Sequence, residues 1–385
     1  MGRWIILAAC IIMQLALGGV YAWSAFVPAL RKGHELHGWQ AGLIFGTTIL
    51  VFTLSMIVSG RSLEKTGPRW MAAAGGLIYG AGYLVAGYSP GDWGWLWLGV
   101  GVMGGIGIGM GYVCPLTTSV RWFPAHKGFV TGVAVAGFGG GAILLAEVAE
   151  ILLTAGWSPL RIFRAMGFTL ASIICLCALT LRFPGPPPVA TTPPLHGMAV
   201  WRDPRFIRLL AGMFGGTFGG LLVIGHLKPI ALVAGLSSGA GALAVSAFAL
   251  GNTLGRMAWG MLHDRFGYVI IPTSMSFLAF SLLGLLDSGV AWRFVGASLV
   301  AGFGFGGCFV VFAADIAATY GVSQVARLYP KVFLAYGLAG VTGPLLGGLL
   351  YDLTGNYVAP VLTATTVAAL GALVTWRLRD KPCSA

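Results

Sequence analysis

Long apolar runs without charged side chains are the feature that most limits what this chain can fold into. Twelve such runs follow one another, bounded by charged residues, glycine and proline. A bilayer core about 30 Å thick takes roughly 20 apolar residues per helix, so each run is long enough to cross it. Only 9% of the 385 residues are charged, too few to cover a soluble globule of this size. The pattern predicts an all-α polytopic membrane protein with twelve transmembrane helices in the lipid bilayer.

The twelve runs fall into two sets of six. The first six start near Trp4, Trp39, Trp70, Trp93, Phe129 and Leu160, and the last six near Arg205, Gly239, Tyr268, Ala291, Val332 and Tyr357. Between the sets, the segments PGPPP and TTPPL form a proline-rich stretch that cannot stay helical. We predict an N-terminal six-helix bundle over residues 1–182, an extended cytoplasmic linker over 183–203 and a C-terminal six-helix bundle over 204–385.

The positive charges predict the orientation of the chain. The net charge is +12, but the Lys and Arg residues form no patch interleaved with exposed aromatic residues, which argues against a nucleic-acid partner. If the N-terminus is cytoplasmic, sixteen of the 23 cations lie at inner loops and ends, and six lie at outer ones. The positive-inside rule favours this arrangement. We expect a multi-pass protein of the cell inner membrane with both termini in the cytoplasm.

The chain lacks the motifs of membrane enzymes and metal sites. It contains no HExxH or DDxxD segment. Cys175 and Cys177 form a C-x-C pair without neighbouring His or acidic residues, so packing explains them better than metal binding. We expect no enzymatic activity, no cofactor and no metal.

Arg256 is the ionisable residue that most clearly needs a functional explanation. It lies inside the eighth run, where a permanent charge costs several kcal/mol unless it faces a cavity or a partner. Asn252 lies one helical turn away on the same face and can orient the guanidinium group. The planar fork of an unpaired arginine suits a carboxylate, so Arg256 predicts a small organic anion as ligand. The alternative to ligand binding is a structural role, in which Asp315 neutralises Arg256 as a gate pair in one conformation.

Other ionisable groups in the spans have simpler expected roles. Glu147 and Glu150, near the end of the fifth run, are expected to pair with Arg161 and Arg164 at the start of the sixth. His226, with Lys228 close by, lies toward the outer end of the seventh run. An interfacial role is expected there, with a proton or anion entry role left open.

Two loops carry matching segments, GRSLEKTGPR at 60–69 and GMLHDRFG at 260–267. Both resemble the G-x-x-x-D-R-x-G loop signature of the major facilitator superfamily, and Glu64 and Lys65 depart from it conservatively. The resemblance implies two pseudo-symmetric six-helix bundles around a central site that opens alternately to each side of the membrane. The loop residues expected to act as conformational latches are Gly60, Glu64, Lys65, Gly67, Arg69, Gly260, Asp264, Arg265 and Gly267.

Four further segments resemble one branch of that superfamily, the bacterial oxalate:formate antiporters and monocarboxylate transporters. They are LGGVYAWSAF (17–26), GIGMGY (107–112), RWFP (121–124) and NTLGR (252–256). In that branch the arginine of the eighth span binds the substrate carboxylate, which implies this role for Arg256, and Asn252 and Tyr112 map onto further contacts.

The eleventh run separates the subfamilies. Oxalate:formate antiporters resemble one another in a lysine just before a glycine there, whereas this chain has Tyr336 before Gly337. One buried cation fits one carboxylate, with Tyr336 as a neutral donor. The apolar walls of the cavity are expected from Tyr21, Trp23, Phe138, Phe309 and Phe312.

The expected function is therefore secondary transport of a small monocarboxylate such as lactate, pyruvate or formate. Proton coupling is expected, with Asp315 and His226 as candidates for the proton site. Exchange of two anions, as in an oxalate:formate antiporter, remains an alternative, and drug efflux is a weaker one because the embedded charge is positive.

Overall fold

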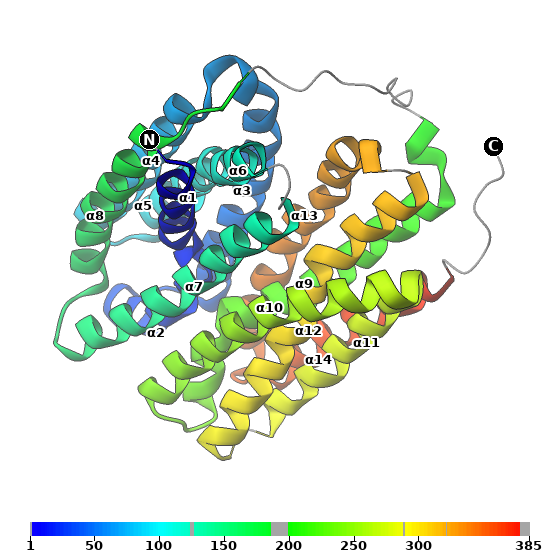
Figure 1. Cartoon of the computed structure of the whole chain (residues 1–385). Helices are drawn as coiled ribbons and strands as arrows, with labels where there is room; N and C mark the ends of the chain where they lie inside the picture. The colour runs from blue at the N-terminus through cyan, green and yellow to red at the C-terminus, as the bar shows by residue number, and fades with distance from the viewer. Residues whose placement is uncertain (1, 124–126, 186–198, 288, 321, 378–385) are drawn as a thin grey trace.

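The computed structural model describes residues 2–123, 127–185, 199–287, 289–320 and 322–377, and the secondary structure within them is helical (Figure 1). The N-terminal half contains α1 (Arg3–Gly18), η1 (Gly19–Ala22), α2 (Trp23–His34), α3 (Gly38–Thr66), α4 (Pro68–Tyr88), α5 (Trp93–Leu96), η2 (Trp97–Met103), α6 (Gly104–Trp122), α7 (Lys127–Thr154) and α8 (Pro159–Thr180). The C-terminal half contains η3 (Ala199–Arg202), α9 (Pro204–Val233), α10 (Ser238–Phe266), η4 (Gly267–Val269), α11 (Ile270–Leu283), η5 (Gly284–Leu286), α12 (Ala291–Tyr320), α13 (Val322–Thr354) and α14 (Val358–Trp376).

Eleven segments of the described chain are apolar and long enough to cross a membrane. One of them, Ser238–Leu286, contains both α10 and the path from η4 to η5, which are separated by a turn at Gly267. Counting these as two crossings gives the twelve that the apolar runs predict. The all-α membrane fold is therefore confirmed.

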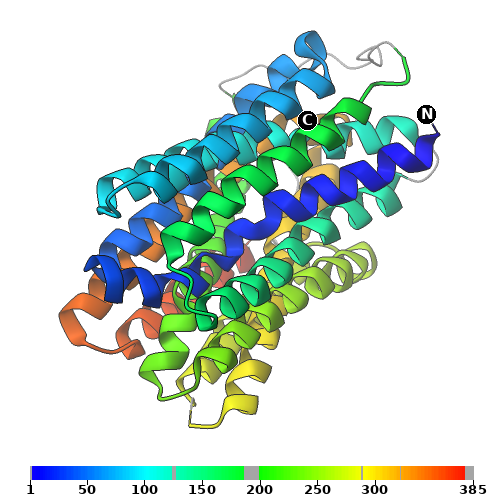
Figure 2. The same cartoon turned by 90° about the vertical axis from the view of Figure 1, so that its left-hand side faces the viewer.

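Several spans differ from simple straight helices. The first span changes from α1 through the 3₁₀ turn η1 into α2, and α1 runs beside α8 along the N-terminal half (Figure 2). The eleventh helix, α13, begins at Val322, ahead of the predicted start near Val332, and Pro330 lies inside it. Residues 186–198 of the proline-rich linker lie outside the described residues. The linker ends in the short helix η3 rather than in extended chain.

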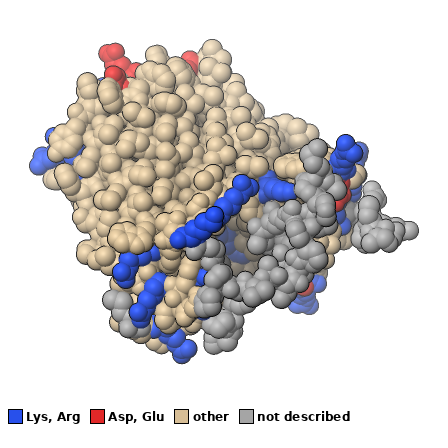
Figure 3. Space-filling view, turned by 90° about the horizontal axis from the view of Figure 1, so that it is seen from above, with Lys and Arg blue, Asp and Glu red and all other residues tan. Residues whose placement is uncertain are grey.

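The helix ends form two faces of the molecule. The terminal face carries the start of α1, the end of α14, the turns after α3 and α10, and the ends of α6, α8 and α12. The opposite face carries the turns after α2, α4, α7, α9, η5 and α13. Gly67 and Gly267 adopt φ values of 79° and 67°, a backbone region that favours glycine, and each ends a long helix there. Figure 3 shows Lys and Arg side chains spread over the terminal face.

The two most extensive contacts between the halves are α3 with α13 and α7 with α10, and α2 also packs against α9. The α3–α13 pair is closest on the opposite face, where glycine brings the two backbones together. A Cβ atom at Gly42 would lie 2.1 Å from the Pro344 carbonyl oxygen, and one at Gly348 would lie 2.1 Å from the Gly38 carbonyl oxygen. Asp352 accepts hydrogen bonds from the backbone nitrogens of Gly38 and Trp39 at 2.9 Å each, and thereby caps α3. The structure is therefore closed toward the opposite face.

We predict that Gly42→Ala forces α3 and α13 apart and favours the state that is open to the opposite face. Overpacking of this kind costs about 1–3 kcal/mol, which corresponds to a change in population from about fivefold to more than a hundredfold. The distance between spin labels at Glu35 and Leu353 checks this, and it should lengthen. Gly296→Ala is the control, because a Cβ atom there meets nothing within 4 Å. An unchanged label distance in Gly42→Ala would contradict the glycine-based closure.

Candidate functional site

Close packing of α10 on α12 fixes the backbone that carries Arg256. A Cβ atom at Gly255 would lie 2.0 Å from the Phe303 carbonyl oxygen, and one at Gly306 would lie 2.3 Å from the Asn252 carbonyl oxygen. Only glycine fits such distances, so the two helices touch through their backbones. This contact sets where the Arg256 side chain starts and which way it points.

Two neighbours hold the guanidinium group. Its Nε donates a hydrogen bond to the Asn252 side-chain oxygen at 3.3 Å, and its carbon lies 4.2 Å from the centre of the Phe309 ring. A cation over an aromatic face is stabilised by about 0.5–2 kcal/mol, more as water is excluded. Tyr112, from the N-terminal half, also lies close to this group. The predicted trio of Arg256, Asn252 and Tyr112 is thus brought together.

A cluster of aromatic rings surrounds this group where the halves meet. The Tyr112 ring lies 5.2 Å from Phe138 and 5.2 Å from Phe52, and both contacts are edge to face. Tyr336 lies 5.4 Å from Phe309, which carries the guanidinium group on its face. The result is a mainly apolar site with one cation and several hydroxyl groups, which is typical of sites for small amphipathic ligands.

Tyr21 and Tyr336 connect the two halves directly. Their hydroxyl oxygens are 2.9 Å apart and both side chains are buried, so one hydroxyl donates to the other across the interface. Tyr336 is therefore close to Arg256 as expected, but its hydroxyl is engaged with Tyr21 in this conformation. Separation of the halves would free both groups.

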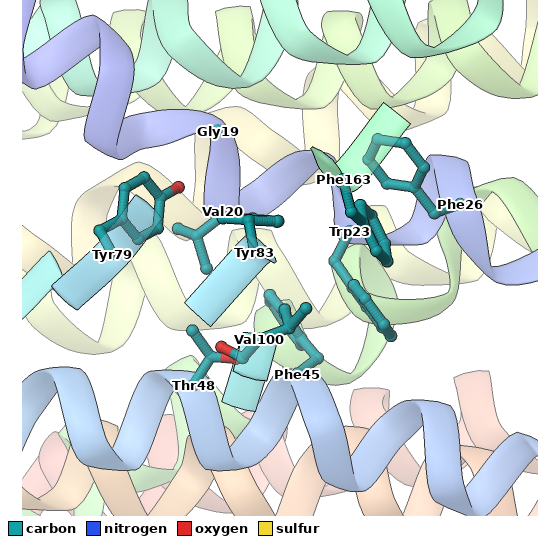
Figure 4. A pocket seen from close by; sticks show the side chains of 10 residues that line it. All are labelled: Gly19, Val20, Trp23, Phe26, Phe45, Thr48, Tyr79, Tyr83, Val100 and Phe163. Carbon is teal, nitrogen blue, oxygen red and sulfur yellow. The ribbon is translucent and has the colours of Figure 1, made fainter. Parts of the chain in front are cut away.

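Two of the residues expected in the cavity wall lie elsewhere. Trp23 lines a separate cavity of about 10 Å³ inside the N-terminal half, where its ring stacks near Phe163 and its Nε1 donates to the Ala41 carbonyl at 3.1 Å (Figure 4). That volume is at most enough for one water molecule, so no substrate fits there. Phe312 packs against Gly212 of α9. Tyr21, Phe138 and Phe309 do lie around the central cluster.

The expected proton-site residues do not contact Arg256. Asp315 accepts from Arg205 at 2.9 Å, near the terminal face, and so does not act as the counter-ion of Arg256 in this conformation. His226 Nε2 donates to the Pro344 carbonyl oxygen at 2.8 Å, and its Nδ1 lies 3.4 Å from the Tyr357 hydroxyl. Both residues are buried and bonded within the C-terminal half.

The expected pairing of the α7 acids with α8 arginines is wrong. Glu150 forms an ion pair with Lys228 of α9, and Glu147 accepts a hydrogen bond from Ser246 of α10 at 2.7 Å. Arg161 instead lies over the Trp157 ring, and Arg164 lies over the Tyr88 ring. Both acids thus reach across to the C-terminal half.

The two signature loops lie on the terminal face, away from Arg256. Arg69 donates to the Leu179 carbonyl at 2.7 Å and so caps the end of α8. Asp264, Arg265 and Lys65 are exposed. The side chain of Glu64 lies outside the described residues, and the latch role of these loops stays a prediction.

Four aromatic residues of the cluster are missing from the sequence-based expectation. They are Phe52, Phe305, Tyr329 and Phe333. Tyr329, Phe333 and Tyr336 recur at the spacing of one helix face, a signal that identifies this face of α13 once its helix is known to begin at Val322.

Comparison with known proteins identifies the family. The family model described as Major Facilitator Superfamily matches residues 5–291 and 223–385. The oxalate:formate antiporter of Oxalobacter formigenes is 26% identical over 97% of this chain and 91% of its own length. Human monocarboxylate transporter 11 is 26% identical over 96% of this chain and 82% of its own length.

Solved structures agree on the fold. The crystal structure of the nucleoside transporter NupG superimposes with a TM-score of 0.77, covering 98% of this chain and 100% of that one at 13% identity. The matches to family, relatives and fold extend over nearly the whole chain. It belongs to the major facilitator superfamily of transporters.

Proposed function

We propose that this protein transports a small monocarboxylate across the cell inner membrane by alternating access, with Arg256 as the carboxylate site. The observation that carries the proposal is one guanidinium group, held by Asn252 and Phe309 inside an aromatic cluster between the halves. A carboxylate matches the planar donors of arginine, and a site shielded from water strengthens the bond. Lactate, pyruvate and formate have the right charge and size class.

The hydroxyl groups around Arg256 support a substrate with further oxygen atoms. Tyr112, Tyr21 and Tyr336 offer hydroxyls that donate or accept hydrogen bonds, and the rings of Phe138 and Phe309 suit a methyl group. A hydroxy or keto acid would use both kinds of contact. The apolar rings thus select for short carbon chains, while Arg256 selects for the anion.

An anion exchanger of the oxalate:formate kind is the second candidate, since one relative carries that name. A dianion would bring a second carboxylate next to one guanidinium group. An uncompensated buried charge costs several kcal/mol, which favours a monoanion in this site.

Closure of the opposite face supports alternating access. The α3–α13 contacts and the Tyr21–Tyr336 bond shield Arg256 from that face, while Arg256 itself keeps partial exposure. We assign the terminal face to the cytoplasm because its Lys and Arg residues follow the positive-inside rule. The conformation is then closed toward the outer side of the membrane, and the two signature loops act as latches on the cytoplasmic side.

We predict that Arg256→Lys weakens binding of pyruvate or lactate by about tenfold to a hundredfold. Lysine keeps the charge but loses the planar fork and the contact with the Phe309 ring, and bonds to charged groups contribute about 1.5–3 kcal/mol. Equilibrium binding to purified protein in nanodiscs measures the effect. Arg161→Lys is the matched control, since Arg161 also lies over an aromatic ring. Equal losses in the two variants would contradict the assignment.

We predict that Tyr336→Lys raises the preference for oxalate over lactate by about tenfold or more, because it adds a second cation near Arg256. Competition of unlabelled oxalate and lactate against a labelled monocarboxylate measures the ratio in proteoliposomes. Tyr336→Phe removes the bond to Tyr21 without adding charge, so it should leave the ratio near the original value. A similar shift in Tyr336→Phe would show that charge is not the cause.

A further inference from the structure

A buried cluster of charged side chains joins the two halves between the Arg256 site and the opposite face. Lys228 of α9 forms an ion pair with Glu150 of α7, and the exposed fractions of the two side chains are 3% and 12%. One turn nearer the centre, Glu147 accepts a hydrogen bond from Ser246 of α10. The N-terminal half supplies two carboxyl groups and the C-terminal half supplies one ammonium group.

Among the residues that the structure describes, the charged groups of the neighbouring helices near this face have partners elsewhere or are exposed. Arg31 lies 4.0 Å from Asp352, Arg161 and Arg164 lie over aromatic rings, His226 donates to Pro344, and Lys32 is exposed. Charge balance within the cluster therefore depends on Glu147, Glu150 and Lys228. With both carboxyl groups ionised its charge is −1, and a single proton makes it neutral.

Opening of the opposite face must break the Lys228–Glu150 pair, because the two residues belong to different halves. A buried charge that loses its partner costs several kcal/mol, whereas a carboxyl group that takes up a proton avoids this cost. The Glu150 side chain is already 12% exposed, and opening of that face admits water to the cluster. A surface hollow of about 460 Å³ is lined by Pro229 and Leu232, which are adjacent to Lys228 in the chain and one turn beyond it.

We infer that Glu150 takes up the proton that accompanies the substrate. When the opposite face opens, the Glu150 carboxylate binds a proton from the water there and becomes a neutral acid. When the face closes, the Lys228 ammonium returns, and the proton leaves through Glu147 toward the central site and the terminal face. One monoanion and one proton then cross together with no net charge. This inference rests on the proposed monocarboxylate transport, and it replaces Asp315 and His226 as coupling candidates.

Two transport assays in proteoliposomes separate coupling from movement of the halves. Exchange of labelled for unlabelled monocarboxylate at equal pH needs only binding and alternating access. Accumulation driven by a pH gradient also needs the proton site. With one proton per substrate, a gradient of about one pH unit supports at most about tenfold accumulation in the wild type.

We expect Glu150→Gln and Glu150→Gln/Lys228→Gln to exchange substrate at near wild-type rates but to show no accumulation above the outside concentration. The double variant removes the unpaired lysine, so it covers the case in which the single variant fails to fold. Asp287→Asn is the control, an equivalent change in an exposed ion pair with Arg293. It should accumulate substrate like the wild type.

Three results would overturn the inference. Accumulation at the wild-type level in both Glu150 variants would show that Glu150 does not couple proton uptake to transport. Loss of exchange in both folded variants would make the pair a gate needed for movement rather than a proton site. A wild type that exchanges but ignores the pH gradient would refute proton coupling while leaving the Arg256 site intact. Failure of monocarboxylate binding to the wild type would instead refute the proposed function.

Discussion

A permanent positive charge within an apolar helix bundle is the constraint on which the rest of this structure depends. The Arg256 guanidinium group cannot lose its charge, so the protein must stabilise it in place. It does so with the Asn252 amide oxygen and the face of the Phe309 ring. Both groups are uncharged, so neither neutralises the guanidinium group. The site therefore keeps a net positive charge that an anion can balance. The surrounding aromatic cluster restricts water and limits the size of that anion.

Glycine makes this arrangement possible at two levels. Within the C-terminal half, backbone contact between α10 and α12 fixes the start of the Arg256 side chain. Between the halves, Gly42 and Gly348 let α3 and α13 approach closely. Contacts of this kind form and separate without unlocking interdigitated side chains, which suits an interface that must open in each cycle. Polar groups such as Asp352 and the Lys228–Glu150 pair add specificity to the closed state.

The sequence predicts the fold and the centre of the site because both depend on local spacing. Apolar runs define the helices, and Asn252 precedes Arg256 by one turn of the same helix. Contacts between helices that are distant in the chain do not follow from local spacing. Arg161 and Arg164 are near Glu150 along the chain, yet Lys228 reaches it from the other half. Asp315 likewise pairs with Arg205 rather than Arg256. The position of Trp23 does not follow from spacing either, since Trp23 comes directly after the turn η1 and lies inside the N-terminal half.

The most direct test of the central claim compares two ligands of the same shape but different charge. Isothermal titration calorimetry of purified protein measures the affinity for lactate and for lactamide. The difference isolates the contribution of the carboxylate, because lactamide keeps the methyl and hydroxyl groups. If Arg256 recognises the anion, lactate should bind at least about tenfold more tightly than lactamide, as expected for a charge-assisted hydrogen bond of 1.5–3 kcal/mol. Equal affinity for the two would contradict a site built on the Arg256 charge.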